Sequence, residues 1–184
     1  MVSINTHGGG SNTTKNGLAF EQNTSLSKAF SDAGYSIVEH KCKKSKYLSY
    51  SIYCNGVYCG YVTKGTRLYK DVLEPKNVHW EKLISQQLFP DDVFISDENK
   101  VAHIVEKKFQ NTHGSVDEKL QTCDYKRRQY EKLFGGIGFE VKYIYVLNDW
   151  FKQDRYKDVL DYIVDSKCYY FFNSIPLSFF NLSK

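Results

Sequence analysis

The chain has 184 residues, of which 41% are hydrophobic and 16% are aromatic, and these values exclude an intrinsically disordered protein. No apolar run approaches the roughly 20 residues that cross a bilayer, and residues 1–17 lack the charged start and apolar middle of a secretion signal. The net charge of +4 is modest for the whole chain. We therefore expect a single domain spanning residues 1–184, cytoplasmic and without membrane contact.

The first predicted elements are a flexible N-terminus and a helix. Residues 1–14 are rich in Gly, Ser, Asn and Thr, which favours a flexible segment. A helix is predicted over residues 16–33 and ends at Gly34. Its apolar face consists of Ala19, Leu26, Phe30 and Ala33.

A basic, Tyr-rich β segment follows at about residues 41–70. It holds no Asp or Glu and six of the fifteen tyrosines. Its basic residues are Lys41, Lys43, Lys44, Lys46, Lys64, Arg67 and Lys70. Basic side chains interleaved with aromatic ones suit a polyanion such as nucleic acid. The alternative is a solvated hairpin whose lysines prevent edge-to-edge aggregation.

Two strands are expected inside this segment, over residues 47–54 and 57–63. They flank Asn55-Gly56, a two-residue turn sequence that favours positive φ at both positions. A short helix around residues 79–88 then leads to Pro90.

The central part of the chain predicts a second hairpin and a second helix. Strands are expected over residues 91–96 and 101–109, joined by turn residues at 97–100. Ser115 and Glu118 have the spacing of a capping box that opens a helix over residues 115–134, and Gly135-Gly136 ends it.

The last predicted elements are a strand over residues 140–147, a helix over 156–164, a strand over 168–172 and a short segment after Pro176. Strands and helices mixed in this order predict an α/β domain with helices packed on a central sheet.

The five cysteines form an odd set without a C-x-x-C pair. This count predicts reduced, mostly buried thiols, and a metal site using Cys54 and Cys59 is the alternative.

Charged residues occupy the adjoining ends of the strands of the second hairpin. Asp91 and Asp92 open the first strand, and Glu106 and Lys108 share one face at the end of the second. Carboxylates brought close together repel unless a divalent cation lies between them, and oxygen ligands favour magnesium or manganese. A lysine beyond such a cation can act on water and stabilise charge on phosphate, which suits hydrolysis of a phosphodiester.

The pattern Pro90-Asp91, fourteen residues, then Glu106-x-Lys108 resembles the signature of PD-(D/E)XK nucleases. The order helix, motif-bearing hairpin, helix, strand over residues 16–148 is similar to the core of that superfamily. The resemblance implies a central mixed β-sheet flanked by helices.

Within the superfamily, "FQNTHGSVDEKLQTCDYKRRQYEKLF" and "YYFFNSIPLSFF" resemble small type II restriction endonucleases. The resemblance implies that Asp91 and Glu106 bind Mg²⁺, for which Mn²⁺ can substitute, and that Lys108 lies at the attacking water. Glu21 occupies the place of a glutamate that many members contribute to the metal site from their first helix.

Each assignment has an alternative. Asp92 could replace Asp91 as the ligand, Glu106 and Lys108 could form a structural ion pair, and Glu21 could be an exposed residue near a helix start. Gln110 follows on the active face and is a candidate for contacting phosphate or water. His103 and Lys107 point to the other face, where His103 is expected to be packed.

Several residues are candidates for DNA contacts. Ser115 lies where backbone N–H groups at a helix N-terminus can hold a phosphate, and Lys119 follows on that helix. The remaining DNA-binding candidates come from the basic segment: Lys43, Lys44, Lys46, Lys64 and Arg67.

These features predict a magnesium-dependent, sequence-specific endonuclease that cuts both strands of duplex DNA as a type II restriction enzyme. Cutting a symmetric site on both strands implies a homodimer with one active site per strand. The alternatives are a resolvase, repair or nicking nuclease on the same core, or a non-catalytic DNA-binding protein.

Overall fold

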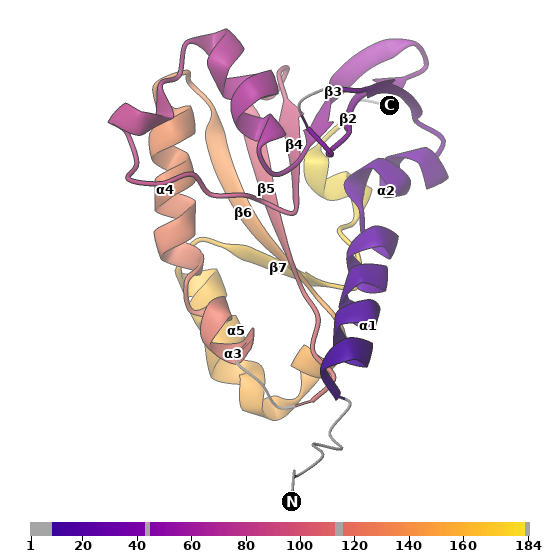
Figure 1. The fold of residues 1–184 in the computed structure, drawn as a ribbon, viewed down its shortest axis with the longest axis vertical. Coiled ribbons are helices and arrows are strands. Elements are labelled where there is room, and N and C mark those ends of the chain that lie inside the picture. The colour runs from indigo at the N-terminus through magenta and orange to yellow at the C-terminus, as the bar shows by residue number, and fades with distance from the viewer. Residues whose placement is uncertain (1–8, 43–44, 113–115, 183–184) are drawn as a thin grey trace, which may run out of the picture.

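The computed structural model describes residues 9–42, 45–112 and 116–182, which form a mixed seven-stranded sheet flanked by helices (Figure 1). The strand order follows the sequence, with antiparallel neighbours from the first to the fifth strand and parallel neighbours from the fifth to the seventh. The strands are β1 (Ser36–His40), β2 (Ser49–Cys54), β3 (Val57–Thr63), β4 (Asp92–Ser96), β5 (Val101–Lys108), β6 (Glu140–Leu147) and β7 (Tyr169–Phe172).

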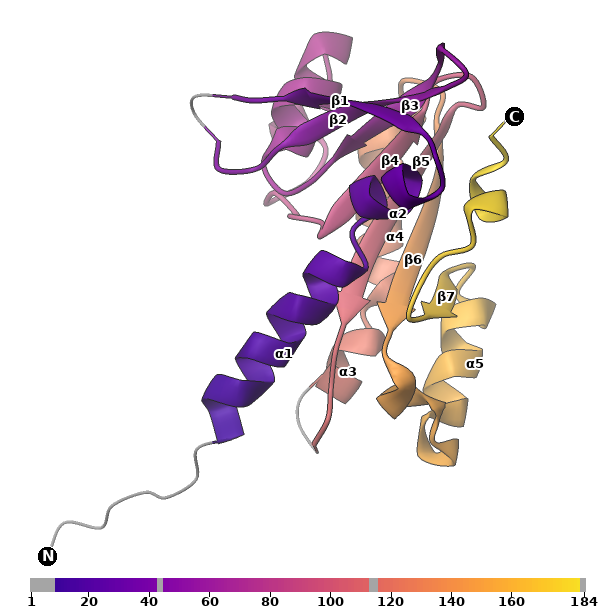
Figure 2. The ribbon, with the colours of Figure 1, turned by 90° about the vertical axis from the view of Figure 1, so that its right-hand side faces the viewer.

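The helices cover both faces of the sheet. They are α1 (Gly9–Asn23), α2 (Leu26–Asp32), α3 (Val116–Leu120), α4 (Cys123–Gly135) and α5 (Lys157–Asp165). Helices α1 and α2 lie on one side of the central strands in Figure 1, and α3, α4 and α5 lie on the other. Figure 2 shows β1 and β2 crossing the direction of β5 and β6, as in a strongly twisted sheet.

Because side chains alternate along a strand, the two faces of the sheet build two hydrophobic cores. Ile104 of β5 joins the core that contains Tyr130 of α4. Its neighbour Val105 joins the core that contains Phe30 of α2 and Phe180 of the C-terminal segment. The strand β5 therefore presents each of its faces to a different set of helices.

Several predicted elements are confirmed. The α/β architecture is the expected one, and β6 has the predicted bounds. The first hairpin turns at Asn55 and Gly56, which have φ of 49° and 79°. The four-residue turn between β4 and β5 is also present.

The predicted helix over residues 16–33 is instead two helices, α1 and α2. The side chain of Ser25 accepts a hydrogen bond from Lys28 N at 3.3 Å and caps α2. Leu26 N donates to Asp92 Oδ2 at 3.1 Å, so a tertiary contact fixes the break. Helix α1 begins at Gly9 and so overlaps the N-terminal stretch predicted to be flexible, of which residues 1–8 lie outside the described part.

The break also changes which of the predicted apolar residues are buried. Leu26 and Phe30 are buried as predicted, whereas Ala19 and Ala33 are exposed. The four residues therefore do not form one continuous apolar face.

The predicted helix over residues 115–134 is also divided, into α3 and α4. Thr122 Oγ1 donates to Lys119 O at 2.8 Å between the two helices. The predicted cap Ser115 lies outside the described residues. The helix expected over residues 79–88 is a single 3₁₀ turn at Trp80–Lys82. Strand β1 and the π-helix Leu68–Leu73 were not predicted.

All five cysteines are free thiols, and Cys59, Cys123 and Cys168 are buried. Among the described residues, no helix is both long and apolar enough to cross a membrane.

Candidate active site

The end of the β4–β5 hairpin brings Asp91 next to Glu106. Asp92 pairs with Val105 across the two antiparallel strands, and continuing this register by one residue sets Asp91 opposite Glu106. The Oδ2 atom of Asp91 accepts a hydrogen bond from Lys107 N at 2.7 Å. This bond fixes the Asp91 carboxylate against the backbone of β5.

Glu106 is a buried carboxylate whose two oxygens are each paired with a lysine. Its Oε2 atom lies 2.9 Å from Lys108 Nζ, on the same strand. Its Oε1 atom lies 3.2 Å from Lys126 Nζ, on α4. Only 6% of Glu106 is exposed, so these two ammonium groups compensate most of the charge that burial would otherwise penalise.

The electrostatics of the pair favour a cation. Burial and, after it, the negative charge of Glu106 raise the pKa of Asp91 to about 6, with part of their effect offset by Lys108. A carboxyl group held in this way is stabilised by a further positive charge. Oxygen-only ligands of this kind suit a hard divalent cation such as magnesium, which commonly uses one or two carboxylates and keeps several waters.

Gln110 follows Lys108 by two residues, and its side chain is buried. It is 4% exposed, and its backbone is fixed by Asn148, which accepts from Gln110 N at 3.1 Å and donates to Gln110 O at 2.8 Å. Neither Oε1 nor Nε2 of its amide has a hydrogen-bond partner among the described residues. A buried amide without a partner is costly, which favours an interaction with water or a ligand.

Asp92, the alternative ligand, faces the opposite side of the sheet. Its Oδ2 atom lies 2.5 Å from Lys107 Nζ, and both side chains are at least 96% buried. Lys107 Nζ also donates to Glu21 O at 3.0 Å. This buried ion pair joins the sheet to α1 and α2, so the geometry favours Asp91 over Asp92 for the active site.

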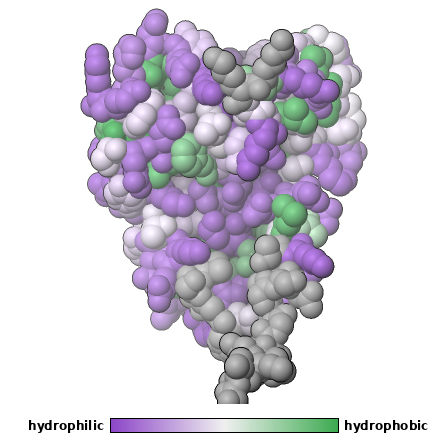
Figure 3. Space-filling view, in the orientation of Figure 1, coloured by the Kyte–Doolittle hydropathy of each residue, from purple (hydrophilic) through white to green (hydrophobic). Residues whose placement is uncertain are grey.

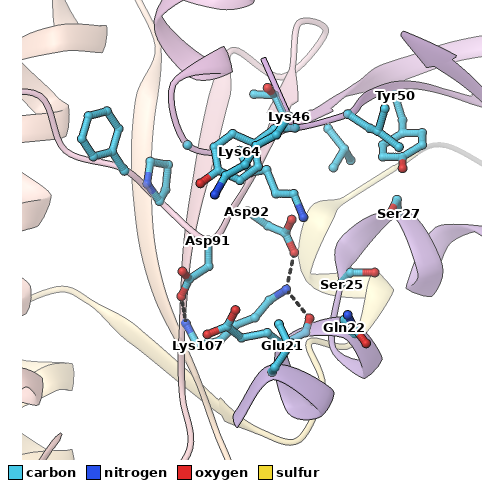
Figure 4. Close-up of a pocket in the computed structure, with 18 residues that line it drawn as sticks. Glu21, Gln22, Ser25, Ser27, Lys46, Tyr50, Lys64, Asp91, Asp92 and Lys107 are labelled. Carbon is cyan, nitrogen blue, oxygen red and sulfur yellow. Dashed lines mark hydrogen bonds and ion pairs between the residues drawn. The ribbon is translucent and has the colours of Figure 1, made fainter. Parts of the chain in front are cut away.

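Glu21 lies on α1, and its side chain is exposed. It lines a cavity of about 470 Å³ together with Asp91, and its charge makes a small contribution to the raised pKa of Asp91 (Figure 4). Within the described part of the chain, however, no three His, Cys, Asp or Glu side chains lie close enough together to hold a metal. The metal-binding role of Glu21 therefore stays a prediction.

The predicted DNA-binding residues have different surroundings. Lys46 and Lys64 both line the cavity beside Asp91, with their Nζ atoms 5.2 and 5.9 Å from the centre of the Tyr47 ring. Lys119 is exposed on α3. Lys43, Lys44 and Ser115 lie outside the described residues.

Arg67, a predicted DNA-binding residue, is buried, and this position does not favour a DNA contact. Its side chain is 4% exposed and forms an ion pair with Asp71 at 2.6 Å. Its Nη1 atom donates to the carbonyl oxygens of His40 and Tyr47. The guanidinium therefore connects the segments around β1 and β2.

Lys126 is the residue whose position the sequence pattern did not reveal. Its partner Glu106 lies twenty positions earlier, on β5. His103, by contrast, is packed as predicted. It is 1% exposed against Phe180, and burial lowers the pKa of His103 to about 4.

The whole arrangement is that of a known family. A family model described as the PD-(D/E)XK nuclease superfamily domain matches residues 12–167. The chain therefore belongs to the PD-(D/E)XK nuclease superfamily, in agreement with the mixed sheet and flanking helices. No curated protein and no solved structure matches the chain significantly.

Proposed function

We propose that this protein is a magnesium-dependent endonuclease that cleaves both strands of double-stranded DNA at a specific sequence. The observation that carries the proposal is the juxtaposition of Asp91 with Glu106, and of Glu106 with Lys108, at the end of one hairpin. Membership of a nuclease superfamily supports a phosphodiester as the bond that is broken.

In this proposal Asp91 and Glu106 would hold Mg²⁺, for which Mn²⁺ can substitute, and Glu21 on α1 is the predicted further ligand. When bound, the cation polarises water and offsets the charge that develops on the phosphate. Lys108, whose ammonium group lies 2.9 Å from Glu106, orients the attacking water and stabilises the charge that develops on the phosphate.

Gln110 supplies an amide to the same site. Its buried Oε1 and Nε2 atoms have no partner among the described residues, so they can bind a phosphate oxygen or the attacking water without first breaking another hydrogen bond. This gives the amide the positioning role expected from its place two residues after Lys108.

Lys126 requires a different account, since it neutralises Glu106 in the absence of a cation. Its exposed fraction, 27%, is larger than the 17% of Lys108, so it is the ammonium group that can move away more easily. We infer that Lys126 leaves Glu106 when a cation binds and then faces the DNA phosphate.

Type II restriction activity is the more specific part of the proposed function. The resemblance of residues 109–134 and 169–180 to small restriction endonucleases supports it. Each chain has one Asp91–Glu106 pair, so cleavage of both strands at a symmetric site is expected from a twofold homodimer.

The experiment is digestion of a mixed-sequence supercoiled plasmid with Mg²⁺, followed by sequencing of the new ends. Discrete linear fragments with a common end sequence are expected, and Ca²⁺ is expected to support binding without cutting. Nicked circles alone would indicate a nicking enzyme, and cleavage restricted to branched DNA would indicate a resolvase. Full activity in excess chelator would exclude the metal-dependent mechanism.

A further inference from the structure

The cavity beside Asp91 has the size of a small-molecule site. Its volume of about 470 Å³ lies within the roughly 300–1,000 Å³ typical of ligand pockets. It lies between the α1–α2 helices and the segments that precede β2 and β4, and Figure 4 shows Asp91 and Glu21 on one side and Lys46 and Lys64 on another.

The floor of the cavity carries no net charge. Asp92 and Lys107 both line it, and their ion pair at 2.5 Å compensates the two charges. Leu26 N also donates to Asp92, so this carboxylate is already engaged by two donors. A ligand that reaches this ion pair therefore meets two charges that already compensate each other.

One rim of the cavity carries two positive charges, the ammonium groups of Lys46 and Lys64. Lys46 and Lys64 both lie over the ring of Tyr47. The ring is held against Gly65, where an added Cβ would lie 2.5 Å from Tyr47 Cε2. Two ammonium groups anchored on one ring suit a phosphate group.

The cavity also has an apolar rim whose side chains are exposed to solvent. Phe89 and Leu18 line the cavity and are 55% and 56% exposed. Large apolar side chains exposed at a pocket are typical of ligand contact, and an aromatic ring can stack on any base. Phe89 directly precedes Pro90 and Asp91, so a base stacked on it belongs to a nucleotide next to the scissile phosphate.

We propose that this cavity binds one unpaired nucleotide of the substrate strand, with its base against Phe89 and Leu18 and its phosphate near Lys46 and Lys64. This inference rests on the proposed function, because Asp91 marks the scissile phosphate. A base inside a duplex is covered by its neighbours, so it must leave the stack to enter a cavity. The substrate class is therefore DNA that is unpaired, or becomes unpaired, beside the cut.

The test compares binding of a fluorescein-labelled 12-nucleotide single strand by the full chain in buffer with EDTA, so that no cleavage occurs. Phe89→Ala should weaken binding about 5- to 150-fold, the range expected for loss of one base–aromatic contact. Phe89→Tyr should restore it. Phe89→Leu keeps the apolar bulk next to Tyr69 and should also weaken binding, which separates stacking from folding.

The matched control is Tyr162→Ala, which removes a 41% exposed aromatic residue of α5 outside this cavity and should leave binding unchanged. Unchanged affinity in both Phe89→Ala and Phe89→Leu would overturn the inference, as would absence of single-strand binding by the wild type. If the wild type cuts no DNA yet binds single strands through Phe89, the proposed function fails and this inference stands.

Discussion

Glu106 shares its two carboxylate oxygens between two lysines, Lys108 and Lys126, on different elements. In the absence of a cation, these ammonium groups compensate the charge of a buried carboxylate. A cation that binds Glu106 must compete with at least one of them. Lys108 and Lys126 therefore compete with the proposed metal for the carboxylate of Glu106.

We expect Lys126→Gln to bind Mn²⁺ more tightly than the wild type in the absence of DNA, by up to about fivefold. The reason is that a partly exposed ion pair contributes at most about 1 kcal/mol, which the cation no longer has to displace. Isothermal titration calorimetry with Mn²⁺ measures this change. Lys132→Gln on the exposed side of α4 is the control, and weaker binding in Lys126→Gln would contradict this account.

Asp91→Asn is expected to stabilise the metal-free protein, because it removes a buried carboxylate that Glu106 repels. The pKa of Asp91 is raised from 3.8 to about 6, so the folded state holds this proton more tightly than the unfolded state. Wild-type stability therefore falls as the pH rises from about 4 to about 6, and it stays low above that range.

At pH 8 the variant should be more stable by roughly 1–3 kcal/mol, and the difference should vanish near pH 4. Urea unfolding in EDTA at several pH values measures it. The hydrogen bond from Lys107 N can still be accepted by the asparagine oxygen. A variant that is less stable at pH 8 would contradict the raised pKa of Asp91.

At the scale of elements, β3 makes a close contact that requires glycine. The β2–β3 register shifts between Ile52 and Tyr53, next to Gly60. An added Cβ on Gly60 would lie 2.4 Å from Ile95 O and 2.6 Å from the Phe94 ring. The backbone of β3 therefore reaches the core only without a side chain at this position.

Gly60→Ala is expected to reduce the free energy of unfolding by about 2–3 kcal/mol, since backbone in neighbouring β4 must shift. Gly136→Ala is the control, because nothing lies within 4 Å of a Cβ at that position. Denaturant titration of both variants measures the effect. Equal stability of Gly60→Ala and the wild type would mean that the β3–β4 contact is looser than described.

The elements that local sequence determines could be predicted. The Asn55-Gly56 turn fixes its hairpin, and alternation along β5 correctly separated Lys108 from Lys107. The breaks before α2 and α4 could not be predicted from the local sequence. The first break depends on a hydrogen bond from Leu26 N to Asp92, which is distant in sequence. The partner of Lys126 was missed for the same reason, because it depends on how α4 packs on the sheet.

At the scale of the whole molecule, α4 lies on one side of the central strands and α1 and α2 lie on the other (Figure 1). The surface along the middle of this view is mainly hydrophilic (Figure 3). Lys46 and Lys64 lie at the cavity near Asp91, whereas Arg67 is buried elsewhere. The basic segment thus divides into a part that lines the cavity and a buried part that stabilises the fold.

We expect Lys46→Gln with Lys64→Gln to weaken DNA binding for all sequences and to flatten its salt dependence. Each lost phosphate contact should remove roughly 0.9 from the slope of log affinity against log salt, so the double variant should lose roughly 1.8. Fluorescence anisotropy at several salt concentrations measures the slope. An unchanged slope would assign both lysines to the solvated surface.

The central claim is that Asp91, Glu106 and Lys108 form one metal-dependent catalytic site. It is tested most directly by plasmid cleavage in Mg²⁺ with Asp91→Asn, Glu106→Gln and Lys108→Ala, using Lys132→Ala as the control. Each of the three variants should fold and bind DNA in EDTA but lose at least about 10²–10⁴-fold in cleavage rate, while the control keeps wild-type activity. Wild-type cleavage by Lys108→Ala, or by either carboxylate variant, would contradict the account.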